Sequence, residues 1–104
     1  MTKKIYHLKT CDKCRRMLKE IDTTDYELQE IKTTPITAKQ LEELYEITQS
    51  YEALFSKRAK KYTQMGLKDK KLTESDIYQL ILTDYTFLKR PIKLCGHEVT
   101  VGKF

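Results

Sequence analysis

The chain has 104 residues, which fits one domain with a single buried core and excludes the need for disulfide staples. Lysine and arginine total 20 against 15 aspartate and glutamate residues. The formal charge of +5 suits oxyanions, acidic peptides or nucleic acid without choosing among them, and equally suits a solvated basic surface. No apolar run has the length of a signal peptide or a membrane span, so we predict a cytoplasmic protein.

The first elements in chain order follow a strand–helix–strand pattern. Residues 3–8 favour a strand, and a helix is predicted to begin at Thr10 or Cys11. One apolar stripe of this helix consists of Cys14, Met17, Leu18 and Ile21. Turn-forming residues 22–25 end the helix, and residues 26–31 suit a second strand. Such a unit predicts two parallel strands with a right-handed crossover.

Two helices in the middle of the chain carry the same start signal. A capping box pairs Thr37 with Gln40 in the first and Thr73 with Asp76 in the second. Apolar residues flank each box, as a hydrophobic staple requires. The region between the two helices reads as helical or mixed. The chain therefore predicts a helical insertion over about 37–83.

The end of the chain predicts a β-hairpin. Ile92–Cys95 and Glu98–Val101 suit two antiparallel strands. Gly96 and His97 suit a two-residue type II′ turn, which prefers glycine at its first central position. The order βαβ, helices, ββ predicts an α/β, thioredoxin-like fold. Its βαβ unit and C-terminal β-hairpin form a four-stranded mixed sheet flanked by helices.

Cys11 and Cys14 form a CxxC pair where the first strand gives way to a helix. Unpaired N–H groups and the helix dipole at that point favour an anion such as a thiolate. The nearby cationic side chains are His7, Lys9, Lys13 and Arg15. Cys11 is therefore predicted to be an exposed, attacking thiolate. Cys14 lies on the apolar stripe and is predicted to be the sheltered, resolving thiol.

Other interpretations of these residues stay open. The CxxC pair also suits half of a zinc site, which Cys95 and His97 would complete only if their hairpin turned inward. Alternatively, Cys11 and Cys14 are two structural cysteines. Pro91 is either a cis proline beside the cysteine or an ordinary proline that starts a strand. Arg58 and Arg90 either bind an oxyanion or carboxylate, or lie on a solvated surface.

Five blocks of residues, spread over nearly the whole chain, carry a family resemblance. They are Tyr6-His7-x-x-x-Cys11-x-x-Cys14-Arg15, Ala53-Leu54-Phe55-x-x-Arg58, Tyr62-x-x-Met65-Gly66-Leu67, Leu88-x-Arg90-Pro91-Ile92 and Val101-Gly102. Together these blocks resemble the arsenate reductase (ArsC) family, which includes the Spx redox regulators. The block around Arg90-Pro91 is specific at its distance from the CxxC pair.

The resemblance implies a thioredoxin-like fold with Cys11 as the catalytic cysteine and His7 as the histidine that favours its thiolate. The family's positions that hold the oxyanion or a redox-partner carboxylate are matched by Arg15, Arg58 and Arg90. Its cis proline is matched by Pro91. We further expect no bound cofactor and no metal, an external thiol donor (glutathione with glutaredoxin, or thioredoxin), a small oxyanion or disulfide substrate, and a monomer.

The chain departs from the arsenate reductase pattern at three points. Cys14 makes a cysteine pair, as in Spx-like members. The late, third anion-binding arginine has no match, and Lys103 is a partial substitute. The family's C-terminal helix is expected to be missing from a single domain over 1–104.

The leading hypothesis is a thiol oxidoreductase. The alternative is an Spx-like redox sensor that binds RNA polymerase, against which the short tail counts.

Overall fold

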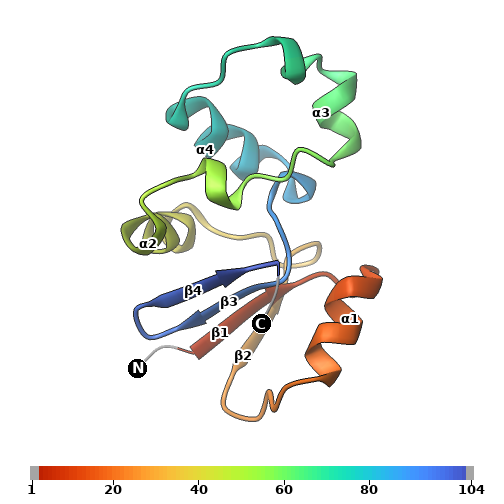
Figure 1. Ribbon diagram of the computed structural model, residues 1–104, viewed down its shortest axis with the longest axis vertical. Coiled ribbons are helices and arrows are strands. Elements are labelled where there is room, and N and C mark those ends of the chain that lie inside the picture. The colour runs from red at the N-terminus through yellow and green to blue at the C-terminus, as the bar shows by residue number, and fades with distance from the viewer. Residues whose placement is uncertain (1–2, 103–104) are drawn as a thin grey trace. The chain divides into compact units, whose positions relative to one another are not determined.

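Figure 1 presents the computed structural model, which describes residues 3–102. The chain forms two compact units. The first combines Met1–Ile36 with Arg90–Phe104, and the second is Thr37–Lys89. The expected helical insertion, about 37–83, lies within the second unit. Within the described residues, no helix combines the length and apolar character needed to cross a membrane.

A four-stranded mixed sheet in the order β2-β1-β3-β4 forms the first unit. The central strand β1 (Lys3–His7) pairs in parallel with β2 (Glu27–Glu30). On its other side β1 pairs antiparallel with β3 (Ile92–Cys95), which pairs antiparallel with β4 (Glu98–Val101). The predicted mixed sheet is confirmed, and the two hairpin strands occupy the residues predicted for them.

The hairpin turn also has the predicted backbone geometry. Gly96 has a φ of 61°, whereas the φ of His97 is not positive. A positive φ at the first central residue alone is the sign pattern of a type II′ turn. The twist of this turn matches that of the strands it joins, so β3 and β4 pair in a fixed register.

Helix α1 (Asp12–Lys19) runs beside the sheet and follows β1 through a short loop (Figure 1). Its apolar stripe is shorter than predicted. The helix ends with Glu20 as its C-cap, so Ile21 lies beyond it. Asp22 accepts a hydrogen bond from the Thr24 N–H at 2.9 Å and starts a turn there. Cys14 is the one stripe residue that is fully buried.

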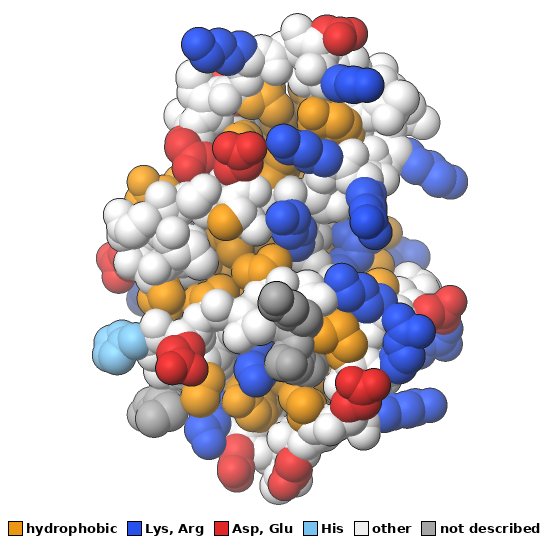
Figure 2. Space-filling model, in the orientation of Figure 1, with side chains coloured by type: hydrophobic (Ala, Val, Ile, Leu, Met, Phe, Trp, Pro, Cys, Tyr) orange, Lys and Arg blue, Asp and Glu red, His pale blue; other side chains and the backbone are white. Residues whose placement is uncertain are grey.

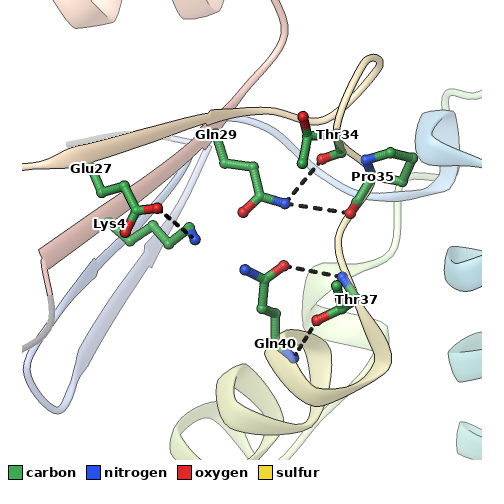
Figure 3. Close-up of polar contacts among 7 residues, drawn as sticks. All are labelled: Lys4, Glu27, Gln29, Thr34, Pro35, Thr37 and Gln40. Carbon is green, nitrogen blue, oxygen red and sulfur yellow. Dashed lines mark hydrogen bonds and ion pairs between the residues drawn. The ribbon is translucent and has the colours of Figure 1, made fainter.

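The turn after β2 is closed by a buried amide (Figure 3). Gln29 is 7% exposed, and its Nε2 donates to the backbone oxygens of Thr34 at 2.9 Å and Pro35 at 3.4 Å. These acceptors satisfy a polar side chain that would otherwise cost free energy when buried. Lys4 and Glu27 form an ion pair of 3.5 Å between the neighbouring strands β1 and β2.

The second unit consists of short helices. They are α2 (Ala38–Thr48), α3 (Lys60–Gln64), α4 (Glu74–Thr83) and the 3₁₀ helices η1 (Glu52–Leu54), η2 (Leu67–Asp69) and η3 (Tyr85–Phe87). Both predicted capping boxes are confirmed. Thr37 and Gln40 exchange hydrogen bonds of 3.1 and 3.0 Å at the start of α2 (Figure 3), and Thr73 and Asp76 do the same at α4. Phe55 stacks on Phe87 in this unit's core.

Candidate thiol-redox site

Cys11 occupies the N-cap position of α1. Its φ of −90° and ψ of 114° are extended, its N–H donates to Leu8 O at 3.1 Å, and its carbonyl accepts from the Arg15 N–H at 3.1 Å. The chain thus leaves the central strand β1, turns once and starts α1 at Cys11. The predicted strand–helix junction is confirmed, with the helix beginning one residue after the cysteine.

The two cysteines of the pair have different surroundings. Cys11 is partly exposed, whereas Cys14 is fully buried, and both are free thiols. This difference confirms the predicted contrast in burial. It follows from helix geometry, because the N-cap residue lies at the surface and the third helical residue turns towards the sheet.

Several groups act on the pKa of the Cys11 thiol. Partial burial is the largest influence and raises it. The N–H and thiol of Cys14, the Lys13 N–H and the charge of Arg90 together outweigh that effect. The pKa of Cys11 therefore lies below the ordinary value of 9.0, so more of this thiol is ionised at neutral pH.

The Cys14 thiol shifts in the opposite direction. Burial raises its pKa most. The hydrogen bond and the negative charge of Cys11 raise it further, while a backbone contact at Leu8 and the charge of Arg90 lower it. The resulting pKa of about 11 keeps Cys14 protonated at neutral pH. The site therefore holds one thiol that favours the anion and one that can donate a proton to it.

Arg90 and Pro91 come to the site from the segment that leads into β3. The Arg90–Pro91 peptide bond is cis, as the family resemblance implies. The carbonyl of Pro91, which is buried, accepts a hydrogen bond of 2.8 Å from the N–H of Gly102, the residue that follows β4. Arg90 lowers the pKa values of both Cys11 and Cys14, so its charge acts directly on the thiol pair.

His7 ends β1 as a buried side chain that is 8% exposed. Burial lowers its pKa most, and the charge of Lys9 lowers it too, while the charge of Glu30 opposes them. The resulting pKa of His7 lies below 6.5, so His7 is mainly neutral at neutral pH. His7 is not among the groups that act most on the pKa of Cys11. Its role beside the thiolate stays a prediction.

Glu30 is a residue of this region that the sequence reasoning missed. One of its carboxylate oxygens accepts the Lys9 N–H at 3.0 Å, in the loop that leads to Cys11. The other oxygen accepts the N–H groups of Lys32 and Thr33 at 3.0 and 2.9 Å. A signal existed in the sequence, because the last residues of two parallel strands meet at one edge of a sheet. His7 pairs with Glu30 in this way.

The remaining predicted anion-binding residues are less closely tied to the thiols. Arg15 forms an ion pair with Asp12 on the first turns of α1. Arg58 is exposed in the second unit, between η1 and α3. Lys103 lies outside the described residues. The binding roles of these three cations stay predictions.

Cys95 and His97 do not join the pair at the start of α1. Cys95 ends β3, and the Tyr26 hydroxyl donates to its thiol, which raises the pKa of Tyr26. His97 is exposed in the hairpin turn. Over residues 3–102, no group of three or more histidine, cysteine, aspartate or glutamate side chains is arranged to hold a metal ion.

The surface beside α1 is strongly basic. Figure 2 shows lysine and arginine side chains gathered on the side of the first unit that carries this helix. Its exposed cations are Lys13, Arg15, Arg16 and Lys19. A positive field at this surface favours anionic reactants in the neighbourhood of Cys11.

Known proteins resemble this chain in sequence and in fold. The global transcriptional regulator Spx of Lactiplantibacillus plantarum is 27% identical over 101 residues, which cover 94% of this chain and 76% of that protein. The uncharacterized protein YusI of Bacillus subtilis is 29% identical and covers 98% of this chain and 91% of its own length. An arsenate reductase from Vibrio cholerae superposes with a TM-score of 0.82 at 21% identity, covering 98% and 90% of the two chains.

The structural likeness confirms the thioredoxin-like α/β fold. The sequence model of the ArsC family matches residues 6–103, which include Cys11, Cys14, Arg90 and Pro91. The resemblance inferred from the five residue blocks is thereby confirmed: the chain belongs to the ArsC family.

Proposed function

We propose that this protein is a thiol oxidoreductase of the arsenate reductase type, in which Cys11 attacks and Cys14 resolves. The observation that carries the proposal is the unequal thiol pair at the start of α1. One thiol is partly exposed with a lowered pKa, and the other is buried with a pKa of about 11. A redox dithiol needs this combination. The attacking group must be a thiolate, and the resolving thiol must stay protonated until the mixed disulfide has formed.

In the first step the Cys11 thiolate attacks one sulfur of a substrate disulfide R–S–S–R′. A bond forms between Cys11 Sγ and the attacked sulfur, the S–S bond breaks, and R′S⁻ leaves. The N–H groups of Lys13 and Cys14 and the charge of Arg90 support the attacking anion. These groups hold the thiolate in place before the reaction, so little reorganisation is needed when it attacks.

The second step depends on the loss of the Cys11 charge. The thiolate is one reason why the pKa of Cys14 is raised, through its hydrogen bond and its negative charge. Once Cys11 is part of a mixed disulfide, both of these influences disappear, so the pKa of Cys14 falls. Cys14 then loses its proton to the departing thiolate and attacks Cys11. The bond between Cys11 Sγ and the substrate sulfur breaks, RS⁻ leaves, and a Cys11–Cys14 disulfide forms, so the substrate disulfide has gained two electrons and been released as two thiols.

The substrate is proposed to be a disulfide or a small oxyanion such as arsenate, held by Arg15 and Arg90, with Pro91 beside the bound group. Arg58 is a further candidate that the family resemblance adds. Glutathione with glutaredoxin, or thioredoxin, would return the pair to the dithiol. We place the protein in the cytoplasm as a monomer, where a reducing thiol pool supplies those donors.

Substitution of each cysteine tests the proposal. We expect Cys11→Ser to abolish reduction of both a mixed disulfide and arsenate with any of these donors. Cys14→Ser should stop the reaction at a mixed disulfide on Cys11, detectable as an added mass in the intact protein. Cys95→Ser is the matched control and should keep full activity. If Cys11→Ser kept full activity, the assignment of the nucleophile would be wrong.

A second function is favoured by the similarity to the regulator Spx. In that case the Cys11–Cys14 pair is a redox switch on a module that binds RNA polymerase. The distinguishing measurement is a pull-down of purified RNA polymerase with the reduced protein, the oxidised protein and Cys11→Ser. Binding that differs between the redox states, without turnover of any disulfide or oxyanion, would favour the switch. Absence of binding in both states would remove it.

A further inference from the structure

The chain between η1 and α4 gathers much of the protein's positive charge. Residues 57–71 contain seven of the 20 lysine and arginine residues but a single acidic residue, Asp69. All seven cations are exposed, and they lie on α3, on η2 and in the turns next to them. We call residues 57–71 the basic segment.

The charges of the second unit are separated rather than mixed. Its α3 and η2 contact each other, and Figure 2 shows lysine and arginine side chains gathered over the part of the unit that carries them. The remainder of Thr37–Lys89 has the opposite balance, with seven acidic residues against two lysines. A surface that serves solubility alone has both signs interspersed, so the basic segment calls for another explanation.

The acidic residues of the unit neutralise little of the basic segment. Lys57 pairs with Glu52 at 3.4 Å, and Lys61 pairs with Asp84 at 2.5 Å. Glu74 is engaged elsewhere, because its carboxylate accepts two backbone N–H groups at the start of η1, both at 3.1 Å. Five cations form no ion pair with any residue over 3–102, namely Arg58, Lys60, Lys68, Lys70 and Lys71. Their charges are therefore available to an anionic partner.

A nucleic acid fits these five cations better than a peptide anion does. Double-stranded DNA carries one negative charge per about 1.7 Å of its axis, whereas an extended peptide has one side chain per about 3.3 Å. Four of the five cations are lysines, whose ammonium groups are point charges that contact single phosphate oxygens. With five residues in α3 and three in η2, neither helix is long enough to read base edges in a major groove. The contacts that remain are those to the phosphate backbone.

We propose that the basic segment binds the phosphate backbone of a nucleic acid, independently of the base sequence. Binding releases counterions from the phosphates, and this release supplies the affinity. Cations that repel one another in the free protein then face a negative partner. The proposal does not rest on the thiol chemistry of Cys11, so the two can fail separately.

The test measures the binding of the full-length chain to two fluorescently labelled DNA duplexes of unrelated sequence. Fluorescence anisotropy gives the affinity between about 50 and 200 mM salt. We expect both duplexes to bind equally, with an affinity that falls steeply as salt is added. The combined variant Lys68→Gln, Lys70→Gln and Lys71→Gln should bind at least about tenfold more weakly at the lowest salt. Its slope of log affinity against log salt should be smaller by about two to three, since each lysine lost removes about one phosphate contact.

A matched control removes the same charge from exposed lysines outside the basic segment. The combined variant Lys32→Gln, Lys39→Gln and Lys89→Gln should keep both the affinity and the salt slope close to those of the wild type. Circular dichroism checks that both variants are folded, and the variant of the basic segment should reduce disulfides at the wild-type rate.

Three results would overturn the proposal. The first is the absence of binding by the wild type at low salt. The second is an equal loss of affinity in the two triple variants, which would mean that net charge alone attracts the DNA. The third is equally tight binding of a polyglutamate peptide, which would assign the basic segment to an acidic protein instead.

Discussion

The start of α1 in the first unit differs from the starts of α2 and α4 in the second. At α2 and α4 a threonine hydroxyl accepts an N–H of the first turn, and the third residue returns a bond to the threonine. At α1 the same position is Cys11, whose side chain makes no such cap hydrogen bond. The third helical residue, a capping partner in the other two helices, is here the buried thiol of Cys14.

The two kinds of helix start use their N–H groups differently. Capped ends use their N–H groups for stability, since a good N-cap contributes about 1 kcal/mol. At α1 the N–H groups of Lys13 and Cys14 instead act on the Cys11 sulfur and lower its pKa. The start of α1 therefore lacks the stabilisation of a side-chain cap, and the same N–H groups stabilise the Cys11 thiolate.

The largest effect is expected when Cys11 is made to resemble the other two helix starts. Cys11→Thr removes the nucleophile, so the rate of disulfide exchange should fall by at least about 1,000-fold. The new hydroxyl can cap α1, so the free energy of unfolding should exceed that of Cys11→Ala by about 0.5–2 kcal/mol. Urea denaturation of both variants measures this difference. Equal stability of the two would contradict the view that α1 lacks a cap.

A smaller effect is expected when Arg90 loses its charge. The pKa of Cys11 should rise in Arg90→Met, because one of the groups that lowers it is gone. Since a higher pKa leaves less thiolate at neutral pH, iodoacetamide alkylation at pH 7 should slow by between about two- and tenfold. The measurement is the alkylation rate as a function of pH. Lys89→Met, which alters the exposed preceding residue, is the matched control and should leave the profile unchanged.

Removing a true cap should affect stability alone. Thr37→Ala breaks the capping box of α2 and should lower the free energy of unfolding by about 1 kcal/mol. The alkylation rate of Cys11 should not change, because the cap lies in the other unit. Thr73→Ala at α4 should behave in the same way. An altered thiol reactivity in either variant would mean that the two kinds of helix start are coupled.

The smallest effect concerns the pH dependence of stability. The pKa of His7 is lowered in the folded protein, so below pH 6.5 the unfolded chain binds more protons. The free energy of unfolding should therefore fall as the pH drops, by at most about 1.4 kcal/mol per pH unit. This part of the pH dependence should be absent from His7→Gln and present in His97→Gln, whose histidine is exposed. Unchanged pH dependence in His7→Gln would show that another group titrates.

Features that depend on neighbouring residues were predictable from the sequence. A capping box involves residues three apart, and Thr37 and Thr73 were both identified. The hairpin strands followed from two short segments joined by a glycine turn, and the unequal burial of Cys11 and Cys14 followed from helical periodicity. Each of these signals is local, so a competing long-range interaction could not easily reverse it.

The remaining features depend on contacts between distant residues. Glu30 reaches the loop before Cys11 only because β1 and β2 pair in one particular register. The ammonium of Lys13 lies at Gly102 only because the chain returns to the sheet at its end. The end of α1 was misjudged for a local reason, since the turn at Asp22 prevailed over the apolar side chain of Ile21.

The division of the first unit into two chain segments has a consequence for synthesis. Cys11 and Cys14 leave the ribosome with β1, but Arg90 and Pro91 follow only after the whole of Thr37–Lys89. Pairing of β3 with β1 must close that long interval, which has an entropic cost and slows folding. A nascent chain therefore carries the cysteine pair before it has the arginine that lowers the pKa of Cys11. The pKa of Cys11 reaches its folded value only when the last strands have joined the sheet.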